Sequence, residues 1–325
     1  MPKRLLIGGW KIEDRNMKLP KSLELNLRKL QDLRYGENPH QQGGFYDEGK
    51  GSGFEKLWGI DLSYNNLEDA YGAWRLVNDF GEPTAAIVKH GNPSGIASRN
   101  NLADAFNLAL EADSISAFGG IVAVNRAPTL AMIEAMRGKF FELVVAPDYE
   151  QKVLERLKRR SEKMRVIRAN PQVANLEIKR IFEGFLVQTP DTLKETPLKW
   201  KAVSGKKPDK KTLADCEFAN KIVKHVKSNA IVIVKNLNMV GVGIGQPNRI
   251  NSVMLATTQA GKKSRGAVLA SDAFFPFDDS VKLAAKAGIS VIVQPGGSIR
   301  DNEVIATAKK LGVTMIFTGV RHFKH

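Results

Sequence analysis

A chain of 325 residues is longer than one typical domain, so we expect either two packed units or one large α/β unit. Its 43% hydrophobic and 26% charged residues are ordinary for a globular protein, and a single cysteine, Cys216, excludes an intramolecular disulfide framework and a cysteine-rich zinc site. The net charge of +15 will attract phosphates and carboxylates, but the basic residues form no RNP-like or helix-turn-helix pattern, so we expect small anionic substrates rather than nucleic acid as partners.

The first half of the chain alternates apolar strands with amphipathic helices. Thr84–Gly95 begins with a buried strand, Ala85–Val88, and we expect a turn of Gly91, Asn92, Pro93 and Gly95 after it. A helix over Asn100–Asp113 follows, because its apolar residues share one face. The strand G-G-I-V-A-V, a helix around Ala131–Gly138 and the strand E-L-V-V-A-P complete this half.

The second half repeats the same order of strands and helices. It contains N-A-I-V-I-V-K, V-G-V-G-I-G and R-G-A-V-L-A-S-D, then a helix with one apolar face and the strand S-V-I-V-Q-P. A last helix with Val304, Ala308 and Leu311 on one face precedes the strand V-T-M-I-F. We therefore predict an internal duplication, in which two related α/β units each have a mostly buried sheet covered by helices.

Composition suggests where these units begin and end. We place a basic leader at residues 1–32, a first α/β subdomain at 33–150 and a second at 212–325. Residues 151–211 between them are rich in charge and contain one apolar strand candidate, Gly184–Gln188, so we expect a connecting and peripheral segment there. The densest basic patches, Lys152–Arg168 and Lys199–Lys211, are typical of solvated helix faces and loops.

Lys89 and His90 form the most informative pair, because a rigid strand delivers both directly into a turn. Histidine titrates near neutral pH and lysine can stabilise negative charge, so the pair suits proton transfer coupled to a developing oxyanion. The alternative is an ordinary strand end with two solvated residues. The terminal T-G-V-R-H-F-K-H is either a solvated basic stub, or it places Arg321 and Phe323 in the same pocket as this pair.

Eight short motifs occur in order along the chain: R-Y-G-E-N-P-H-Q, L-S-Y-N-N, V-K-H-G-N-P-S-G, S-A-F-G-G-I-V-A, V-K-H-V-K-S-N-A-I-V, G-I-G-Q-P-N-R-I, A-S-D-A-F-F-P-F-D-D and T-G-V-R-H-F-K-H. Together they closely resemble the AICAR transformylase domain, the formyltransferase half of the bifunctional purine-biosynthesis family that also contains IMP cyclohydrolase. The resemblance extends from about Leu33 to the last residue.

The resemblance implies transfer of a formyl group from 10-formyltetrahydrofolate to the 5-amino group of AICAR. It implies two cytidine-deaminase-like α/β/α subdomains without zinc and a homodimer in which both chains build each site, and it leaves open a monovalent cation. Carried over by motif, the catalytic positions are Lys89, His90 and Asn229. The AICAR-binding positions are Arg34, Tyr35, Gly119, Glu142, Asn229, Arg249, Phe274 and Arg321, and the folate-binding positions are Ile250, Asp279, Ser298 and Ile299.

The chain departs from the family pattern before the R-Y-G motif, where the leader stands in place of a cyclohydrolase domain. We therefore expect either a monofunctional transformylase, or one half of a split system whose IMP cyclohydrolase is another polypeptide. No membrane-length apolar run and no signal peptide are present in the sequence, so we expect a cytoplasmic protein. The alternatives are an inactive or repurposed homologue that binds nucleotide or RNA, and a zinc-dependent deaminase.

Overall fold

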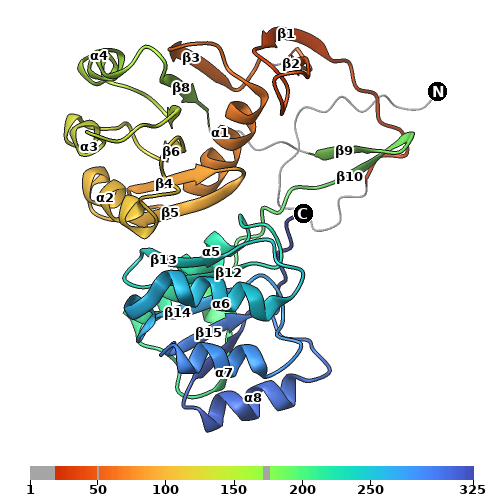
Figure 1. Ribbon diagram of the computed structural model, residues 1–325. Helices are drawn as coiled ribbons and strands as arrows, with labels where there is room; N and C mark the ends of the chain where they lie inside the picture. The colour runs from red at the N-terminus through yellow and green to blue at the C-terminus, as the bar shows by residue number, and fades with distance from the viewer. Residues whose placement is uncertain (1–18, 50, 171–175) are drawn as a thin grey trace.

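Two similar units make up the body of the protein, as seen in the computed structural model, which describes residues 19–49, 51–170 and 176–325. Each unit is built on a six-stranded mixed sheet with helices on both faces (Figure 1). This arrangement confirms the predicted duplicated α/β class. Within the described ranges, no helix is both long and apolar enough to cross a membrane.

The first unit has the strand order β3-β8-β7-β6-β4-β5. Its strands are β3 (Phe54–Trp58), β4 (Thr84–Lys89), β5 (Asn92–Ser98), β6 (Ile121–Val124), β7 (Leu143–Ala146) and β8 (Arg165–Ala169). Its helices are α1 (Tyr64–Val77), α2 (Leu102–Ala112), α3 (Leu130–Ala135) and α4 (Gln151–Arg160). Helices α2, α3 and α4 cover one face of the sheet, and α1 packs against the other.

The second unit repeats this topology with the strand order β11-β16-β15-β14-β12-β13. Its strands are β11 (Lys201–Ser204), β12 (Ile231–Val234), β13 (Met239–Gly243), β14 (Val268–Ser271), β15 (Val291–Gln294) and β16 (Thr314–Phe317), and its helices are α5 (Lys210–Val223), α6 (Arg249–Ala260), α7 (Asp279–Lys286) and α8 (Asp301–Lys310). Every strand pair has the same direction as its counterpart, with two parallel pairs flanked by antiparallel ones. The predicted duplication is therefore present in the order, direction and helical cover of the strands.

Strand alternation explains how the layers pack. In β4, Ala86 and Val88 point toward α1, whereas Ala85 and Ile87 point toward the outer helices α2 to α4. Successive strand residues point to opposite faces, so a strand that is apolar at every position has both faces buried. The inner faces of the two sheets, with α1 and α5, belong to one hydrophobic cluster that runs through both units.

The two units lie side by side along their edge strands β5 and β13. Ala97 at the end of β5 forms an antiparallel bridge with Asn238, and the backbone N–H of Ser98 donates to the Leu237 carbonyl at 3.0 Å. Asp79 and His225 occupy equivalent positions before β4 and β12, and their side chains form a hydrogen bond of 2.6 Å. Contact between equivalent residues means that the units are related by an approximate two-fold rotation.

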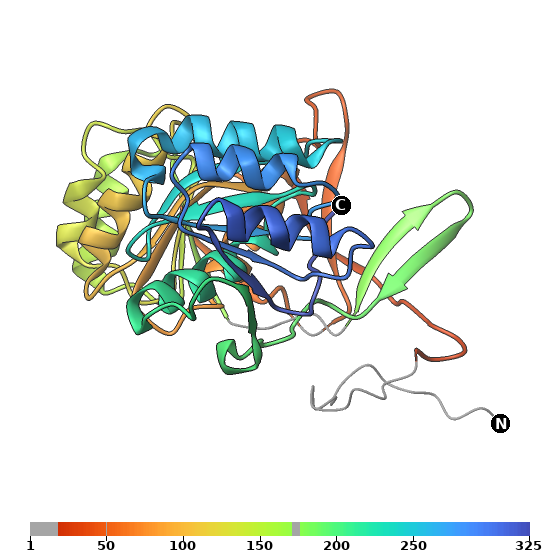
Figure 2. The same ribbon diagram turned by 90° about the horizontal axis from the view of Figure 1, so that it is seen from below.

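The segment 151–211 differs from the peripheral connection that we expected. It supplies β8 to the first sheet and β11 to the second, so the first sheet extends to Ala169 rather than ending at residue 150. The predicted strand Gly184–Gln188 is β10, which pairs with β9 (Glu177–Ile181) in a hairpin that projects from the body (Figure 2).

Part of the predicted basic leader, residues 1–18, lies outside the described residues. β1 (Arg28–Leu33) pairs with β2 (Gly43–Asp47).

The turn predicted after β4 is shorter than expected. Only His90 and Gly91 form it, and Asn92 and Pro93 begin the strand β5. Proline has no N–H to donate to a neighbouring strand, which argued against a strand at this point. Here β5 is the outermost strand of its sheet and the register shifts by one residue opposite Val88, so a missing donor is tolerated.

Two glycines let a helix approach each edge strand closely. A Cβ added at Gly95 in β5 would lie 1.8 Å from the Ala109 carbonyl oxygen of α2. A Cβ added at Gly241, the equivalent position in β13, would lie 2.2 Å from the Ala256 carbonyl oxygen of α6. Because these contacts are with helix backbone, neither neighbour can give way without moving the helix.

We expect Gly95→Ala and Gly241→Ala each to lower the free energy of unfolding by roughly 3 kcal/mol, as overpacked substitutions do. Urea denaturation followed by circular dichroism measures this. The control is Gly72→Ala in α1, where the added Cβ meets no atom within 4 Å and the helix gains propensity. Wild-type stability in both edge variants would contradict the rigid approach of helix and strand.

Candidate active site

The predicted site residues of the first unit lie along one edge of its sheet, the edge formed by strand ends where the parallel strands β6, β7 and β8 begin. Lys89 ends β4, which pairs with the start of β6, and β6, β7 and β8 are parallel and begin side by side. Gly119 and Glu142 precede β6 and β7, so they line the same edge as Lys89. Arg34 and Tyr35 are tied to this edge because their backbones hydrogen bond with Leu62 and Tyr64.

Site residues of the second unit lie at the opposite end of the equivalent strands. Asn229 precedes β12, whereas Asp272, Ser298 and Arg321 follow β14, β15 and β16. The two-fold relation between the units turns these opposite ends to the same side of the molecule. The Lys227 N–H donates to the Asn92 side-chain oxygen at 3.0 Å, which joins the two edges directly.

Lys89 and His90 occupy the tip of the β4–β5 hairpin. His90 is exposed and has a φ of +53°, and the Lys89 ammonium donates to the Phe118 carbonyl at 2.8 Å. Both residues line a cavity of about 280 Å³, whose wall includes Ser94 of the first unit and Val242 and Ile244 of the second. An accessible imidazole beside an ammonium group can serve as a base next to a site that stabilises negative charge.

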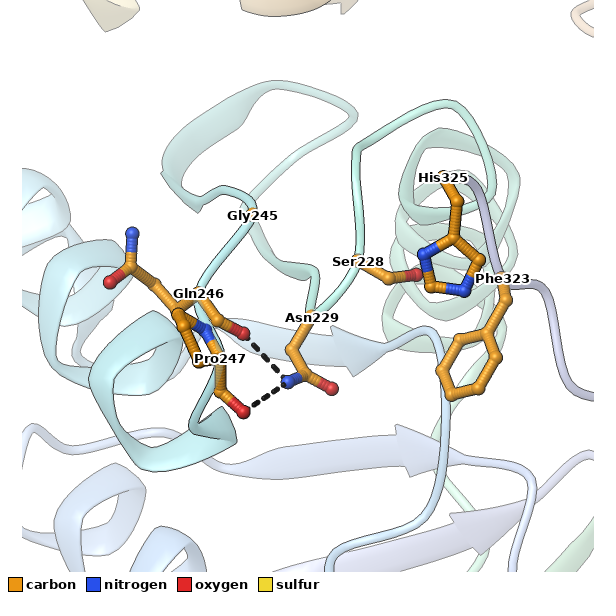
Figure 3. A pocket seen from close by; sticks show the side chains of 7 residues that line it. All are labelled: Ser228, Asn229, Gly245, Gln246, Pro247, Phe323 and His325. Carbon is orange, nitrogen blue, oxygen red and sulfur yellow. Dashed lines mark hydrogen bonds between the residues drawn. The ribbon is translucent and has the colours of Figure 1, made fainter. Parts of the chain in front are cut away.

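Asn229 lines a second cavity, of about 340 Å³, with Ser228, Gly245, Gln246, Pro247, Phe323 and His325 (Figure 3). Its side-chain nitrogen donates to the carbonyls of Gln246 and Pro247 at 2.7 and 3.2 Å. Its side-chain oxygen accepts from Arg249 at 2.6 Å. These contacts fix which end of the amide is nitrogen and leave the oxygen with one further acceptor position.

Arg249 is buried rather than open to a ligand. Its guanidinium donates to Asn229, to the Ser271 hydroxyl at 2.8 Å and to the buried carboxylate of Asp272. Asp272 also accepts from the Ser228 hydroxyl at 2.5 Å. A buried charge needs a paired and hydrogen-bonded counter-charge, and Asp272 supplies it. The structure therefore places Arg249 behind Asn229, where it orients the amide.

The predicted nucleotide-binding residues of the first unit form one cluster. The Arg34 guanidinium lies 5.4 Å from the centre of the Tyr35 ring, and Glu142 accepts from the Asn66 amide at 2.8 Å. Gly119 has a φ of +74° and open space where a side chain would be, so a ligand can approach its backbone. An exposed guanidinium next to a fixed carboxylate can bind phosphate and hydroxyl groups.

Five further positions lie on the second unit beyond the buried Arg249. Ile250 follows it in α6, Phe274 is 37% exposed, and Asp279 begins α7. The Ser298 N–H donates to Asp301 at 3.2 Å, and the neighbouring Ile299 side chain is fully exposed. The exposed apolar side chains of Phe274 and Ile299 suit a flat ring system, as the resemblance implies.

The C-terminal tail differs from both expectations. It is not a solvated stub, because His322 is buried, and Phe323 lines the Asn229 cavity rather than the cavity of Lys89 and His90. Arg321 is exposed and stacks on Phe323, with 4.5 Å from its guanidinium carbon to the ring centre. Lys324 makes the link to the tip, since its ammonium donates to the Gly91 carbonyl at 3.1 Å and the His225 carbonyl at 2.8 Å.

Comparison with known families settles which family this chain is part of. A model described as the AICARFT/IMPCHase bienzyme matches residues 6–259. The chain belongs to the AICARFT/IMPCHase bienzyme family.

Relatives of this bienzyme family show how much of the chain is shared. A bifunctional purine biosynthesis protein PurH of Rippkaea orientalis is 48% identical over 316 residues, which are 94% of this chain and 61% of the relative. PurH of Synechocystis sp. is 50% identical, covering 91% of this chain and 59% of the relative. PurH of Thermoanaerobacter sp. is 45% identical, covering 98% and 64%. The chain thus spans about three fifths of the length of these relatives.

A solved structure of RibD from Acinetobacter baumannii is also similar, but only weakly. It is 19% identical, covers 33% of this chain and 34% of its own, and has a TM-score of 0.24, which is too low to support an argument about the fold.

Arg165 and Asn66 join the site of this family member although neither was named as a candidate. Arg165 lies in the basic patch that we took for a solvated face, but its side chain is only 4% exposed. It donates to the Asp61 carbonyl at 3.0 Å, and its guanidinium lies 3.6 Å from the Glu142 carboxylate. The sequence could have pointed to Arg165, because it comes directly before the apolar residues of β8. At that position it pairs with Leu143 and therefore lies beside Glu142.

Cys216, the single cysteine of the sequence, is buried in α5. Burial raises the pKa of Cys216 to about 12, so its thiol stays protonated near neutral pH. In the part of the chain that the structure describes, no group of three or more His, Cys, Asp or Glu side chains is placed to hold a metal ion.

His322 anchors the tail with two carboxylates. Its Nδ1 lies 2.6 Å from an Asp191 oxygen and its Nε2 lies 2.8 Å from a Glu195 oxygen. Burial alone would lower the pKa of His322, but hydrogen bonds to Asp191 and Glu195 and their charges raise it to about 9. The imidazolium therefore holds the tail against residues of the segment between the two sheets.

This anchor predicts a pH-dependent stability difference between wild type and His322→Gln. The pKa of His322 is about 9 in the folded protein and 6.5 in the unfolded chain, so protonation favours the folded state. This stabilisation is complete below about pH 6.5 and is lost as the pH rises through about 9. At pH 6 we expect the wild type to be more stable by at most about 3 kcal/mol, and at pH 10 by much less.

Urea unfolding of both proteins at pH 6, 7.5 and 10 measures this difference. Lys324, whose pKa burial and nearby positive charges lower to about 8, titrates in both proteins, so its effect cancels in the comparison. A stability difference that is constant with pH would rule out a charged His322.

Proposed function

We propose that this chain transfers the formyl group of 10-formyltetrahydrofolate to the 5-amino group of AICAR, giving FAICAR and tetrahydrofolate, in purine biosynthesis. The observation that carries the proposal is the placement of Lys89, at the end of β4, and His90, on a left-handed turn, in a cavity lined by both units. Membership of the bienzyme family supports it, since the catalytic motifs are intact in this sequence.

The reaction needs a base because the AICAR amine is a poor nucleophile, its lone pair being delocalised into the ring and carboxamide. The amine nitrogen bonds to the formyl carbon while His90 takes an amine proton, and the formyl oxygen becomes an oxyanion beside the Lys89 ammonium. The bond from that carbon to N10 of the folate then breaks, and the proton passes from His90 to N10. A positioned base contributes roughly 10²–10⁴ in rate and an oxyanion donor about 10²–10³.

The side-chain amide of Asn229 can present only its oxygen to the substrate amine. Both N–H groups of its amide are engaged by backbone carbonyls, so only its oxygen is left to accept a hydrogen bond. Figure 3 shows the amide nitrogen turned toward these carbonyls and the oxygen turned away from them. We infer that Asn229 accepts an N–H of the AICAR amine or carboxamide and that Arg249 keeps the amide in this orientation.

The remaining positions divide by chemistry between the two substrates. Arg34, Tyr35 and Arg321 supply positive charge and a ring surface for the nucleotide and its phosphate, and Glu142 supplies acceptors for ribose hydroxyls. We assign Gly119 and Phe274 to AICAR, with Arg249 acting through Asn229, and we assign Ile250, Asp279, Ser298 and Ile299 to the folate. Four expectations from the sequence stay predictions. They are a monovalent-cation requirement, a cytidine-deaminase-like relationship of each unit, a separate IMP cyclohydrolase and residence in the cytoplasm.

An assay of tetrahydrofolate formation from AICAR and 10-formyltetrahydrofolate tests the function. We expect the wild type to turn over and His90→Ala to lose at least about 10²-fold in kcat while AICAR binding, measured by calorimetry, stays within a few-fold. Asn236→Ala is the matched control, because Asn236 occupies the equivalent tip of the second unit with a φ of +54°. No turnover by the wild type, together with salt-dependent retention on nucleic acid, would favour a repurposed binding protein instead.

We also propose that the chain forms a homodimer through the β9–β10 hairpin. Two-stranded hairpins are marginally stable alone, and this one projects from the body in both views (Figures 1 and 2). Its apolar side chains are open to solvent, with Phe182 94%, Phe185 55% and Leu186 57% exposed. A second copy of the chain would cover these side chains and brace the hairpin.

Sedimentation velocity measures the assembly. We expect a dimer for the wild type and a shift toward monomer for Phe182→Asp, because the substitution places a charge in the apolar contact. Leu311→Asp is the control, since Leu311 is 43% exposed and directly follows α8, which lies well away from the hairpin in Figure 1. A dimer that persists in Phe182→Asp would exclude the hairpin as the contact.

A further inference from the structure

The turn that carries His90 is held entirely by side chains from outside the hairpin loop. His90 and Gly91 have φ values of +53° and +73°, as the two central residues of a type I′ turn require. Asp69 of α1 accepts the His90 N–H at 3.1 Å and the Gly91 N–H at 2.6 Å. Asn92 donates to the His90 carbonyl at 3.0 Å, and Lys324 donates to the Gly91 carbonyl. All four backbone polar groups of these two residues are therefore bonded.

The second unit has an equivalent left-handed turn held by an aspartate, but without a histidine. Asn236 and Leu237 have φ values of +54° and +52°, and Asp215 of α5 accepts their N–H groups at 2.8 and 2.6 Å. Lys235 donates to the Arg265 carbonyl at 2.7 Å, as Lys89 does to the Phe118 carbonyl. The aspartate clamp thus belongs to the duplicated fold, and only the first unit presents an imidazole on it.

A left-handed conformation is unfavourable for histidine unless its surroundings impose it. Non-glycine residues rarely adopt positive φ, and the type I′ turn prefers Asn-Gly over His-Gly. If the Asp69 carboxylate is lost, two N–H groups lose their acceptor and the right-handed conformation becomes competitive. That change would turn the imidazole away from the cavity, and a base misplaced by about 1 Å can cost on the order of 10²-fold in rate.

We propose that Asp69 is a positioning residue for His90. Its carboxylate holds the left-handed turn that aims the imidazole into the cavity, and it does so through the backbone without touching substrate. This inference rests on the proposed function of His90 as the base of formyl transfer. Asp215 performs the same structural task on a turn without a histidine, so it separates positioning from stability.

The experiment compares Asp69→Asn with Asp215→Asn in the full chain. An asparagine keeps the size of the side chain, but its NH₂ group cannot accept the second N–H. We expect similar losses of stability in urea and faster amide exchange in each affected hairpin, at residues 84–98 or 231–243. For Asp69→Asn we expect kcat to fall at least tenfold while KM for AICAR stays within threefold, and for Asp215→Asn we expect kcat to stay within twofold.

The outcomes separate failure of this inference from failure of the proposed function. An inactive wild type refutes the function, whereas an active wild type with equal kcat in both variants refutes the positioning role. If Asp69→Asn does not fold, Asp69→Glu keeps both acceptor oxygens at a displaced position. A lowered kcat at unchanged KM in Asp69→Glu supports positioning, and wild-type kcat there overturns it. Amide exchange of the β4–β5 hairpin needs no turnover, and unchanged protection in the Asp69 variant would refute the clamp itself.

Discussion

The hydrogen bond between Asp79 and His225 joins equivalent positions of the two units, so it marks the approximate two-fold axis between them. Burial alone would raise the pKa of Asp79, but His225 and Lys224 beside it lower the value to about 2, so the carboxylate is charged. Edge strands β5 and β13 run antiparallel next to this pair. Nearly everything else in the candidate site follows from that arrangement.

Because of the two-fold rotation, the two similar units contribute opposite ends of their strands to the candidate site. The first unit contributes the edge where its parallel strands begin, and the second contributes the edge where its parallel strands end. The tip of the β4–β5 hairpin lies at the first of these edges, and the start of β12 lies at the second. A reaction that joins two large substrates can therefore use a hairpin tip from one copy and an amide from the other, at Lys89 and Asn229.

The strands were predictable because they are buried on both faces. Runs such as A-A-I-V and I-V-I-V are apolar at every position, and the structure places each in the interior of a sheet. The sheet edges were not predictable in the same way. Pro93 in the edge strand β5 argued against a strand, and the edge strand β11 lies in a charge-rich stretch whose composition is typical of a connection. Edge strands carry polar residues and proline because one side of them needs no hydrogen-bonding neighbour.

Local pattern alone determined the alternation of strands and helices, the duplication, and the turn that presents Lys89 and His90, because each depends on residues close together in the chain. The family resemblance rests on short motifs of the same kind. Tertiary structure alone decided that Arg249 stands behind Asn229, that Arg165 supports Glu142, and that Lys324 rather than Arg321 reaches the His90 turn. These contacts join residues far apart in the chain, and a buried charge can be recognised as buried only when the surface that covers it is known.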